Sequence, residues 1–146
     1  LSPQQRAVAL ERLLMATLLQ FTLPGMPSIY YADEAGMEGY KDPFNRRPYP
    51  WGTEDPQILA HHRLLGKLRR EYPALRVGDI QFTVACDYRL AYKRIYEGKT
   101  LWIYVNRGVD NWEIPRGKML LGHNLYSVLP DNIVLAPMGF CVVEGK

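Results

Sequence analysis

Apolar residues recur every three or four positions in the first part of the chain, as they do on one face of an amphipathic helix. The residues of this face are Leu10, Leu13, Leu14, Thr17, Leu18 and Phe21. Ser2 is a suitable N-cap, Pro3 fits the first turn, and Gln5 completes a capping-box pattern. The pattern predicts a helix that begins at Ser2 and is stopped by the sequence Leu23-Pro24-Gly25.

The next segment reads as a short strand, a long loop and a second helix. Residues 27–32 are apolar without alternation, which favours a strand, over Ile29–Ala32, buried on both faces of a parallel sheet. Residues 33–52 are rich in Gly, Pro, aromatic and charged residues and show no period, so they form a long loop. Such loops are usually functional. A helix then starts at Asp55-Pro56 and ends at Tyr72, before Pro73.

The pattern changes after Leu75 to short strands separated by turns, which is typical of an antiparallel sandwich or barrel. Glu97-Gly98-Lys99 is a hairpin turn signal, and Asn106-Arg107-Gly108 is a second turn. The predicted strands are Ile80–Ala85, Arg89–Tyr96, Leu101–Val105, Leu125–Val128, Ile133–Leu135 and Phe140–Val143. The boundary near residue 75 divides the chain into a mixed α/β part, 1–75, and an all-β part, 76–146.

Composition and charge argue against several classes of function. The 146 residues carry a formal charge of +3, and the densest basic cluster, Arg63 to Arg70, alternates with leucines as on the wet face of a helix. No coherent basic stripe argues for nucleic-acid binding. No apolar run is long enough to span a bilayer, and no signal peptide is recognisable. Cys86 and Cys141 lie in strand-like apolar runs, which favours buried free thiols over a disulfide and, weakly, a cytoplasmic location.

The segment Leu23 to Trp51 carries an ordered series of motif residues. It reads LPGMPSIYYADEAGMEGYKDPFNRRPYPW. The segment closely resembles the connection between the last strand and last helix of the barrel in the alpha-amylase family (glycoside hydrolase family 13). The consensus sequence there is PGxPxIYYGDE-x-GM, then a polar loop, then DPxxRxPxPW. Ala32 stands where that family commonly has glycine. The wording is closest to the neopullulanase and α-glucosidase branches.

The resemblance implies an α+β fragment: residues 1–75 as the last β/α unit of a TIM barrel, and residues 76–146 as the antiparallel β-sandwich that follows it. It also implies a retaining α-glucan hydrolase for α-1,4 bonds and, as in some members of the family, α-1,6 bonds, without cofactor or metal, whose three catalytic carboxylates lie upstream of residue 1. No position here matches those motifs, so a truncated chain that is inactive alone is expected. Asp33 and Glu34 are neighbours and do not replace them, since a retaining pair stands about 5–5.5 Å apart across the bond.

Asp42 and Arg46 match residues that, by the resemblance, hydrogen-bond glucose hydroxyls of an α-glucan or maltooligosaccharide. A carboxylate accepts from two hydroxyls and a guanidinium offers several fixed donors. A surface salt bridge that holds the loop is the alternative interpretation. Glu34, Tyr40 and Arg47 are weaker candidates for substrate binding.

Three further expectations follow. His61 and His62 belong to the helix surface or partial core, because adjacent helical residues are poor joint metal ligands. The aromatics of the all-β part are expected mostly in its core; a carbohydrate-binding module that uses them as a platform is the alternative function. They are Tyr88, Tyr92, Tyr96, Trp102, Tyr104, Trp112 and Tyr126. Surface exposed by truncation is expected to give a homodimer, or to repack the first helix and strand onto the second helix and sandwich.

Overall fold

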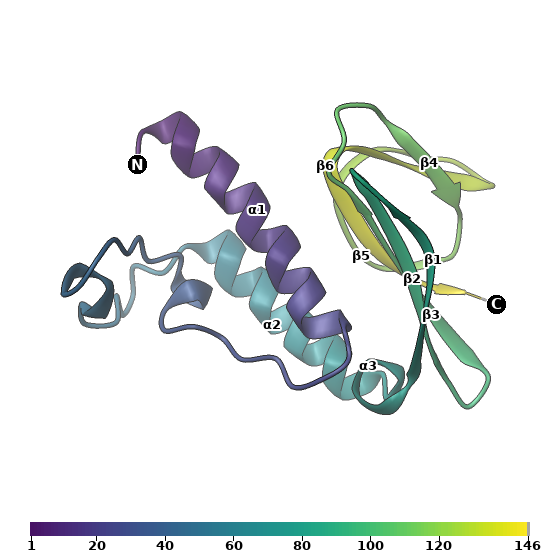
Figure 1. Ribbon diagram of the computed structural model, residues 1–146, viewed down its shortest axis with the longest axis horizontal. Helices are drawn as coiled ribbons and strands as arrows, with labels where there is room; N and C mark the ends of the chain where they lie inside the picture. Colours follow the sequence, from purple (N-terminus) through teal and green to yellow (C-terminus); the bar gives the residue numbers. More distant parts are fainter. Residues whose placement is uncertain (146) are drawn as a thin grey trace.

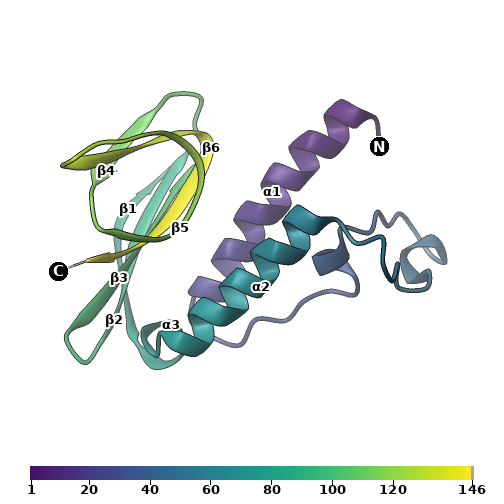
Figure 2. The same ribbon diagram turned by 180° about the vertical axis from the view of Figure 1, so that it is seen from behind.

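The computed structural model describes residues 1–145 and consists of two long helices with shorter helical turns, a long loop and one β-sheet (Figure 1). The helical elements are α1 (Pro3–Thr22), η1 (Asp33–Ala35), η2 (Phe44–Arg46), α2 (Pro56–Glu71) and α3 (Ala74–Val77). The strands are β1 (Asp79–Cys86), β2 (Arg89–Tyr96), β3 (Lys99–Asn106), β4 (Trp112–Pro115), β5 (Lys118–Val128) and β6 (Asn132–Gly145). The two long helices lie side by side between the loop and the sheet (Figures 1 and 2).

Both predicted helices are confirmed, together with their start signals. The Ser2 hydroxyl accepts from the backbone N–H of Gln5 at 3.2 Å, and the Gln5 side chain accepts from the Ser2 N–H at 2.9 Å, which completes the capping box. In α2 the Asp55 carboxylate accepts from the N–H groups of Gln57 and Ile58. These local signals fix where each helix begins.

The predicted strand Ile29–Ala32 is wrong: residues 26–30 are irregular and residues 31–32 form a turn that leads into η1. Within the described residues, every strand of the sheet comes from residues 79–145, so this segment has no partner strand. The side chains of Ile29, Tyr30 and Tyr31 are exposed by 44%, 61% and 47%. An apolar strand buried on two faces needs neighbours that this segment does not meet.

The sheet is antiparallel throughout, as predicted, with the strand order β1-β2-β3-β6-β4 and β5 also paired with β6. The hairpin turn at Glu97 and Gly98 is confirmed by positive φ angles at both residues. The two strands predicted at 133–135 and 140–143 are one strand, β6, and the short β4 was not predicted. β5 begins at Lys118, earlier than expected.

The long β6 bends the sheet over itself. Its first part, Asn132–Leu135, pairs with β4, whereas its last part, Phe140–Gly145, pairs with β3. Between them Met138 has a φ of 59°, an uncommon left-handed conformation for a residue other than glycine. The all-β part is therefore one antiparallel sheet that curves around its own apolar interior.

Two apolar cores result from this arrangement. The larger lies between α1, α2 and the outer face of the sheet and includes Leu18, Leu65 and Phe140. The smaller lies inside the curved sheet and contains Tyr104, Ile133 and Cys141 among others. Because α1 contributes to the first core, it is packed against both α2 and the sheet.

Two arginines link these elements: Arg94 ties β2 to α1 and α3, and Arg69 ties α2 to α1 and α3. Arg94 of β2 is only 1% exposed and donates to the carbonyls of Thr22, Leu75 and Gly78. Arg69 of α2 donates to the carbonyls of Phe21 and Leu75. Thr22 ends α1, so the positive charge lies at the negative end of that helix dipole. The carbonyls, rather than a carboxylate, compensate the buried charge.

The remaining side-chain expectations have mixed outcomes. Cys86 and Cys141 are both free thiols, but only Cys141 is buried, so the prediction of a buried Cys86 is wrong. His62 is buried and His61 is partly buried, as expected. No helix among the described residues is long and apolar enough to cross a membrane.

His61 makes the stability of the fold depend on pH. Its Nε2 donates to the Leu14 carbonyl at 2.9 Å, and burial lowers the pKa of its imidazole to about 4. Since the ordinary pKa is about 6.5, the unfolded chain takes up a proton before the folded chain does, and stability is lost as the pH falls from about 6.5 to about 4. After allowance for partial exposure, the loss is on the order of 1–2 kcal/mol.

We expect His61→Gln, which keeps an N–H donor but cannot titrate, to remove this dependence. Urea unfolding at pH 7 and pH 5 should show a smaller difference in the free energy of unfolding for the variant than for the parent. Equal differences for the two proteins would contradict the assignment.

Candidate functional site

The polar loop between α1 and α2 extends away from the sheet, at the far end of the helix pair (Figures 1 and 2). Arg6 of α1 holds it, because its guanidinium contacts Glu38 at 2.6 Å and Asp55 at 3.5 Å. The backbone N–H of Asp55 also donates to the Ala35 carbonyl at 3.0 Å. The middle of the loop and its C-terminal end are therefore tied to the start of α1 and to each other.

Two left-handed residues flank η1 and turn the loop. Ala32 has a φ of 62° and Gly36 a φ of 68°. A Cβ at Gly36 would come within 2.6 Å of Ile58 Cδ1, so only glycine fits between the loop and α2. Ala32 is buried and holds the same conformation at a cost that glycine would avoid. The position that commonly carries glycine in the resembled family thus has the conformation that favours glycine.

Asp42 and Arg46 are brought together as an ion pair, with Arg46 Nε 3.2 Å from Asp42 Oδ1. Their side chains are 64% and 76% exposed. An exposed pair contributes little to stability, because water competes for both charges. The pair agrees with the salt-bridge interpretation, and it also presents an acceptor and a planar set of donors to solvent.

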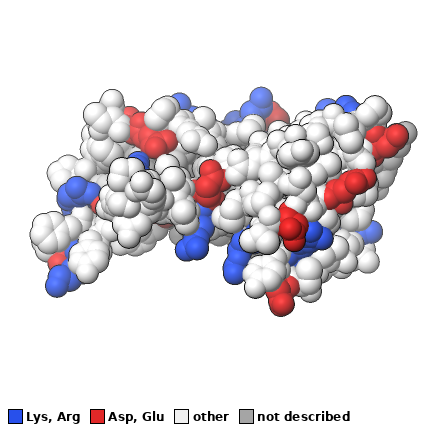
Figure 3. Space-filling view, turned by 90° about the horizontal axis from the view of Figure 1, so that it is seen from above, with Lys and Arg blue, Asp and Glu red and all other residues white. Residues whose placement is uncertain are grey.

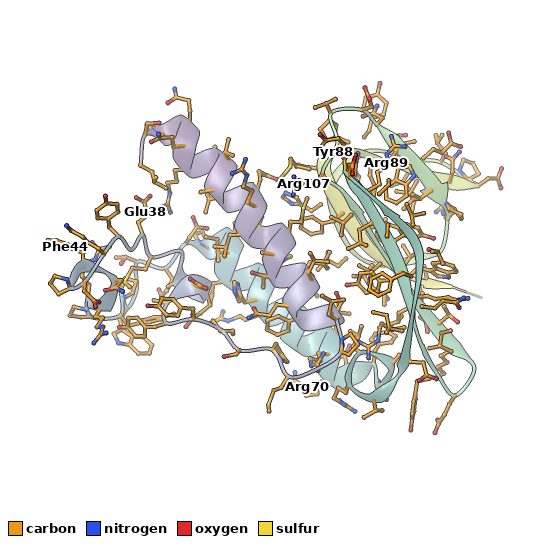
Figure 4. The ribbon with its side chains drawn as sticks, in the orientation of Figure 1. Glu38, Phe44, Arg70, Tyr88, Arg89 and Arg107 are labelled. Atoms are coloured by element: carbon orange, nitrogen blue, oxygen red, sulfur yellow. The ribbon has the colours of Figure 1, made fainter. Side chains whose placement is uncertain are left out.

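The weaker candidates Tyr40 and Arg47 lie on a neighbouring surface. Both line a hollow of 520 Å³ together with Glu38 and Phe44, while Asp42 and Arg46 do not line it. Tyr40 is 84% exposed. Figure 4 shows Glu38 and Phe44 on the part of the loop that reaches farthest from the sheet. The loop therefore offers two adjacent polar surfaces rather than one closed pocket.

Sequence reasoning missed Glu38 and Arg6, which organise the larger cleft of 590 Å³ at the base of the loop. The hydrogen bond from Arg6 holds the pKa of Glu38 below its ordinary value. A carboxylate kept ionised in this way is a poor general acid. Asp55, which also lines this cleft, accepts from Arg6 and caps α2.

Asp33 and Glu34 stand on consecutive positions of η1, not at a strand end. Burial raises the pKa of Asp33, and Glu34 adds to that effect. The Oε2 atom of Glu34 is buried without a hydrogen-bond partner among the described residues. Neither carboxylate lines the 590 Å³ cleft. Because both residues lie on one short turn, their carboxylates do not stand on opposite sides of a glycosidic bond.

The other candidate groups are structural. No group of three or more His, Cys, Asp or Glu side chains in residues 1–145 could hold a metal ion. Tyr92 and Tyr104 are core residues, whereas Tyr88 and Tyr126 are 59% and 71% exposed. The exposed pair lies on a turn and on β5, so the prediction that most of these aromatics are buried is only partly confirmed. Figure 3 shows acidic and basic side chains scattered over the visible face without a single-signed stripe.

Chemically, the loop presents carboxylate acceptors, guanidinium donors and exposed aromatic rings. That set suits a neutral polyhydroxyl ligand, whose hydroxyls donate and accept and whose C–H faces pack on rings.

Comparison with known proteins gives several relatives. The chain is 42% identical over 99 residues to amylopullulanase of Thermoanaerobacter thermohydrosulfuricus, covering 67% of this chain and 7% of that enzyme. It is 39% identical over 113 residues to cyclomaltodextrinase of Geobacillus thermopakistaniensis, covering 71% of this chain and 19% of that enzyme. No family model matches the chain.

Among solved structures, the debranching enzyme from Nostoc punctiforme superimposes with a TM-score of 0.80 at 29% identity, over 93% of this chain and 31% of that one. The acarbose-soaked form of the same enzyme has a TM-score of 0.78 at 29% identity, over 93% of this chain and 29% of that one. The chain spans less than a third of the length of each of these relatives.

Proposed function

The chain belongs to the alpha-amylase family of glycoside hydrolases, as its C-terminal part, and we propose that it completes a longer retaining α-glucan hydrolase. Residues 1–75 would end the (β/α)8 barrel, and residues 76–146 would form the β-domain that follows. The substrates would be α-1,4-linked and α-1,6-linked glucans or maltooligosaccharides.

One observation carries the proposal: the ordered motif series from Leu23 to Trp51 folds as a solvent-facing polar loop that presents the exposed Asp42–Arg46 pair. The relatives support the substrate class, since they are named amylopullulanase and cyclomaltodextrinase. Barrel enzymes assemble their sites from the loops that follow the strands, and this loop would occupy such a position in the longer polypeptide.

In this proposal Asp42 and Arg46 bind glucose hydroxyls. The carboxylate accepts from two neighbouring hydroxyls, and the guanidinium donates to oxygens in one plane. Their mutual ion pair holds both side chains near one geometry in the free protein. Glu34, Tyr40 and Arg47 would have supporting roles, with the Tyr40 ring available for packing against a sugar face.

The catalytic carboxylates would lie in the preceding part of the longer polypeptide. A retaining mechanism needs one carboxylate as nucleophile and a second as acid and base, about 5–5.5 Å apart. The loop's exposed aromatic residues would then contact that preceding part or a second copy of the chain. The most exposed apolar side chains of the loop are Met26, Tyr40 and Trp51.

We expect the 146-residue chain alone to release no sugar from maltoheptaose or pullulan. A longer polypeptide that contains this chain should hydrolyse maltoheptaose and release products in the α-anomeric form. Proton NMR of the anomeric signals in the first minutes of reaction measures both results. Release of β-anomers would contradict retention, and turnover by the chain alone would contradict its dependence on other residues.

Calorimetry with maltoheptaose separates this proposal from a non-catalytic carbohydrate-binding module. Tight binding by the chain alone that is lost in Tyr126→Ala, and kept in Asp42→Ala, would indicate the module instead.

A further inference from the structure

A second cleft lies between α1 and the edge of the sheet, far from the polar loop. It has a volume of 570 Å³, within the range of small-molecule sites. Its residues come from α1, from the turn between β1 and β2, from the turn after β3 and from the bend of β6. They are Arg12, Met15, Ala16, Leu19, Tyr88, Arg107 and Met138.

One side of this cleft is a helix face. Arg12, Met15, Ala16 and Leu19 recur at helical spacing along α1, so they present one continuous surface. The surface is apolar except for the guanidinium of Arg12 at its N-terminal end. It provides a floor against which the carbon skeleton of a ligand can pack.

The opposite side is a fixed wall. The backbone N–H of Arg107 donates to the Tyr88 carbonyl at 2.7 Å, which ties the two turns together. Asn106, which is fully buried, donates to the carbonyls of Asp110 and Ala136 and accepts from the Gly108 N–H. Figure 4 shows Tyr88 and Arg107 near one another at the edge of the sheet that faces α1.

The bend in β6 contributes the last lining residue. Met138 is in the left-handed region and packs partly against the helix-facing core. Bulges of this kind often direct a side chain toward a site. The strained position therefore adds an apolar side chain to the cleft.

The charges in the cleft are unbalanced. Arg12 and Arg107 are exposed to solvent, and within residues 1–145 neither side chain makes a hydrogen bond or ion pair. Among the described residues that line the cleft there is no Asp or Glu. Two guanidiniums without a counter-charge favour an anion, and guanidinium groups bind phosphate and carboxylate by paired hydrogen bonds.

We propose that this cleft binds a small organic anion, a sugar phosphate whose phosphate lies between Arg12 and Arg107. The sugar would pack its C–H face on the Tyr88 ring and on the methionines. The identity of the sugar body rests on the proposed function in glucan metabolism, whereas the anion follows from the two arginines alone.

The test is an NMR titration of the full chain, observing backbone amides, with glucose 1-phosphate, glucose and inorganic phosphate as separate probes. Glucose 1-phosphate is expected to shift amides near residues 12–19, 88, 107 and 138, and to bind about tenfold or more tightly than glucose or phosphate. Arg107→Gln and Arg12→Gln should each weaken it about tenfold or more. Arg107→Lys should recover part of the affinity.

Lys67→Ala is the control, because it removes an exposed positive charge on α2 outside this cleft and should leave glucose 1-phosphate binding unchanged. Loss of binding in Asp42→Ala would place the ligand at the loop and overturn the proposal. Equal affinity for glucose, or no effect of either arginine substitution in folded variants, would also overturn it. Binding that survives while the longer polypeptide fails to hydrolyse glucans would refute only the proposed function.

Discussion

Replacement of Arg94 by methionine is expected to lower the free energy of unfolding by about 3 kcal/mol and the melting temperature by about 10 °C. The substitution keeps much of the side-chain volume but removes the donors to the carbonyls of Thr22, Leu75 and Gly78, at 2.6, 3.2 and 2.8 Å. Leu75 keeps a donor in Arg69, so the cost falls on the other two carbonyls. Each buried carbonyl left without a partner costs about 1–3 kcal/mol.

Urea unfolding followed by circular dichroism measures the effect, and Arg76→Met is the matched control. Arg76 also donates to backbone carbonyls, those of Arg69 and Arg70, but its side chain is exposed. Water replaces its donors, so a loss below about 1 kcal/mol is expected. Arg94→Lys should be intermediate, because one ammonium cannot reach all three acceptors. Equal losses for the Arg94→Met and Arg76→Met proteins would show that burial does not determine the effect.

The importance of Arg94 could not be predicted from the sequence. It stands in a strand that was predicted over the correct residues, Arg89–Tyr96. Its carbonyl acceptors, however, belong to residues 22, 75 and 78, which the fold alone brings together. A charged residue in a strand is usually taken as solvent-facing. Burial of Arg94 is favourable only because the C-terminus of α1 lies next to the α3–β1 connection, where the carbonyl acceptors come together.

The elements predicted well are those whose signals are local. Both helices follow from their caps and their 3.6-residue period, and the hairpin turn follows from Glu97 and Gly98. The strand at Ile29–Ala32 failed because burial on two faces depends on neighbours that the local pattern cannot supply. The bend at Met138 interrupts the alternation as a turn does, so the pattern predicts two strands where the structure has one.

The residues of the candidate site also divide into those that local sequence signals identify and those that depend on distant neighbours. The ordered motif series identifies Asp42 and Arg46, and the surface salt bridge that was the alternative interpretation is present. The contact between Arg6 and Glu38 was missed because the residues lie 32 positions apart and neither has a distinctive neighbour. The cleft that contains Arg12 and Arg107 is lined by residues from four separate segments, so no local sequence pattern predicts it.

In the longer polypeptide, Asp42→Ala and Arg46→Ala are each expected to lower kcat/KM for maltoheptaose about 10-fold to 100-fold. A hydrogen bond to a charged group is worth about 1.5–3 kcal/mol, and a factor of ten corresponds to about 1.4 kcal/mol. Because the two side chains pair with each other at 3.2 Å, the double variant should lose less than the product of the single losses. Steady-state kinetics on the four proteins measures this coupling.

The control for charge and exposure is the pair Lys67 and Glu71 on α2. It has the same spacing, with its charged atoms 3.9 Å apart and its side chains 59% and 49% exposed. Removing either exposed pair should change the free energy of unfolding by less than about 1 kcal/mol. Lys67→Ala with Glu71→Ala should therefore leave kcat/KM within about twofold, so that a large loss at the loop reports substrate contact rather than stability. Equal kinetics for the two double variants would mean that the Asp42–Arg46 pair only holds the loop.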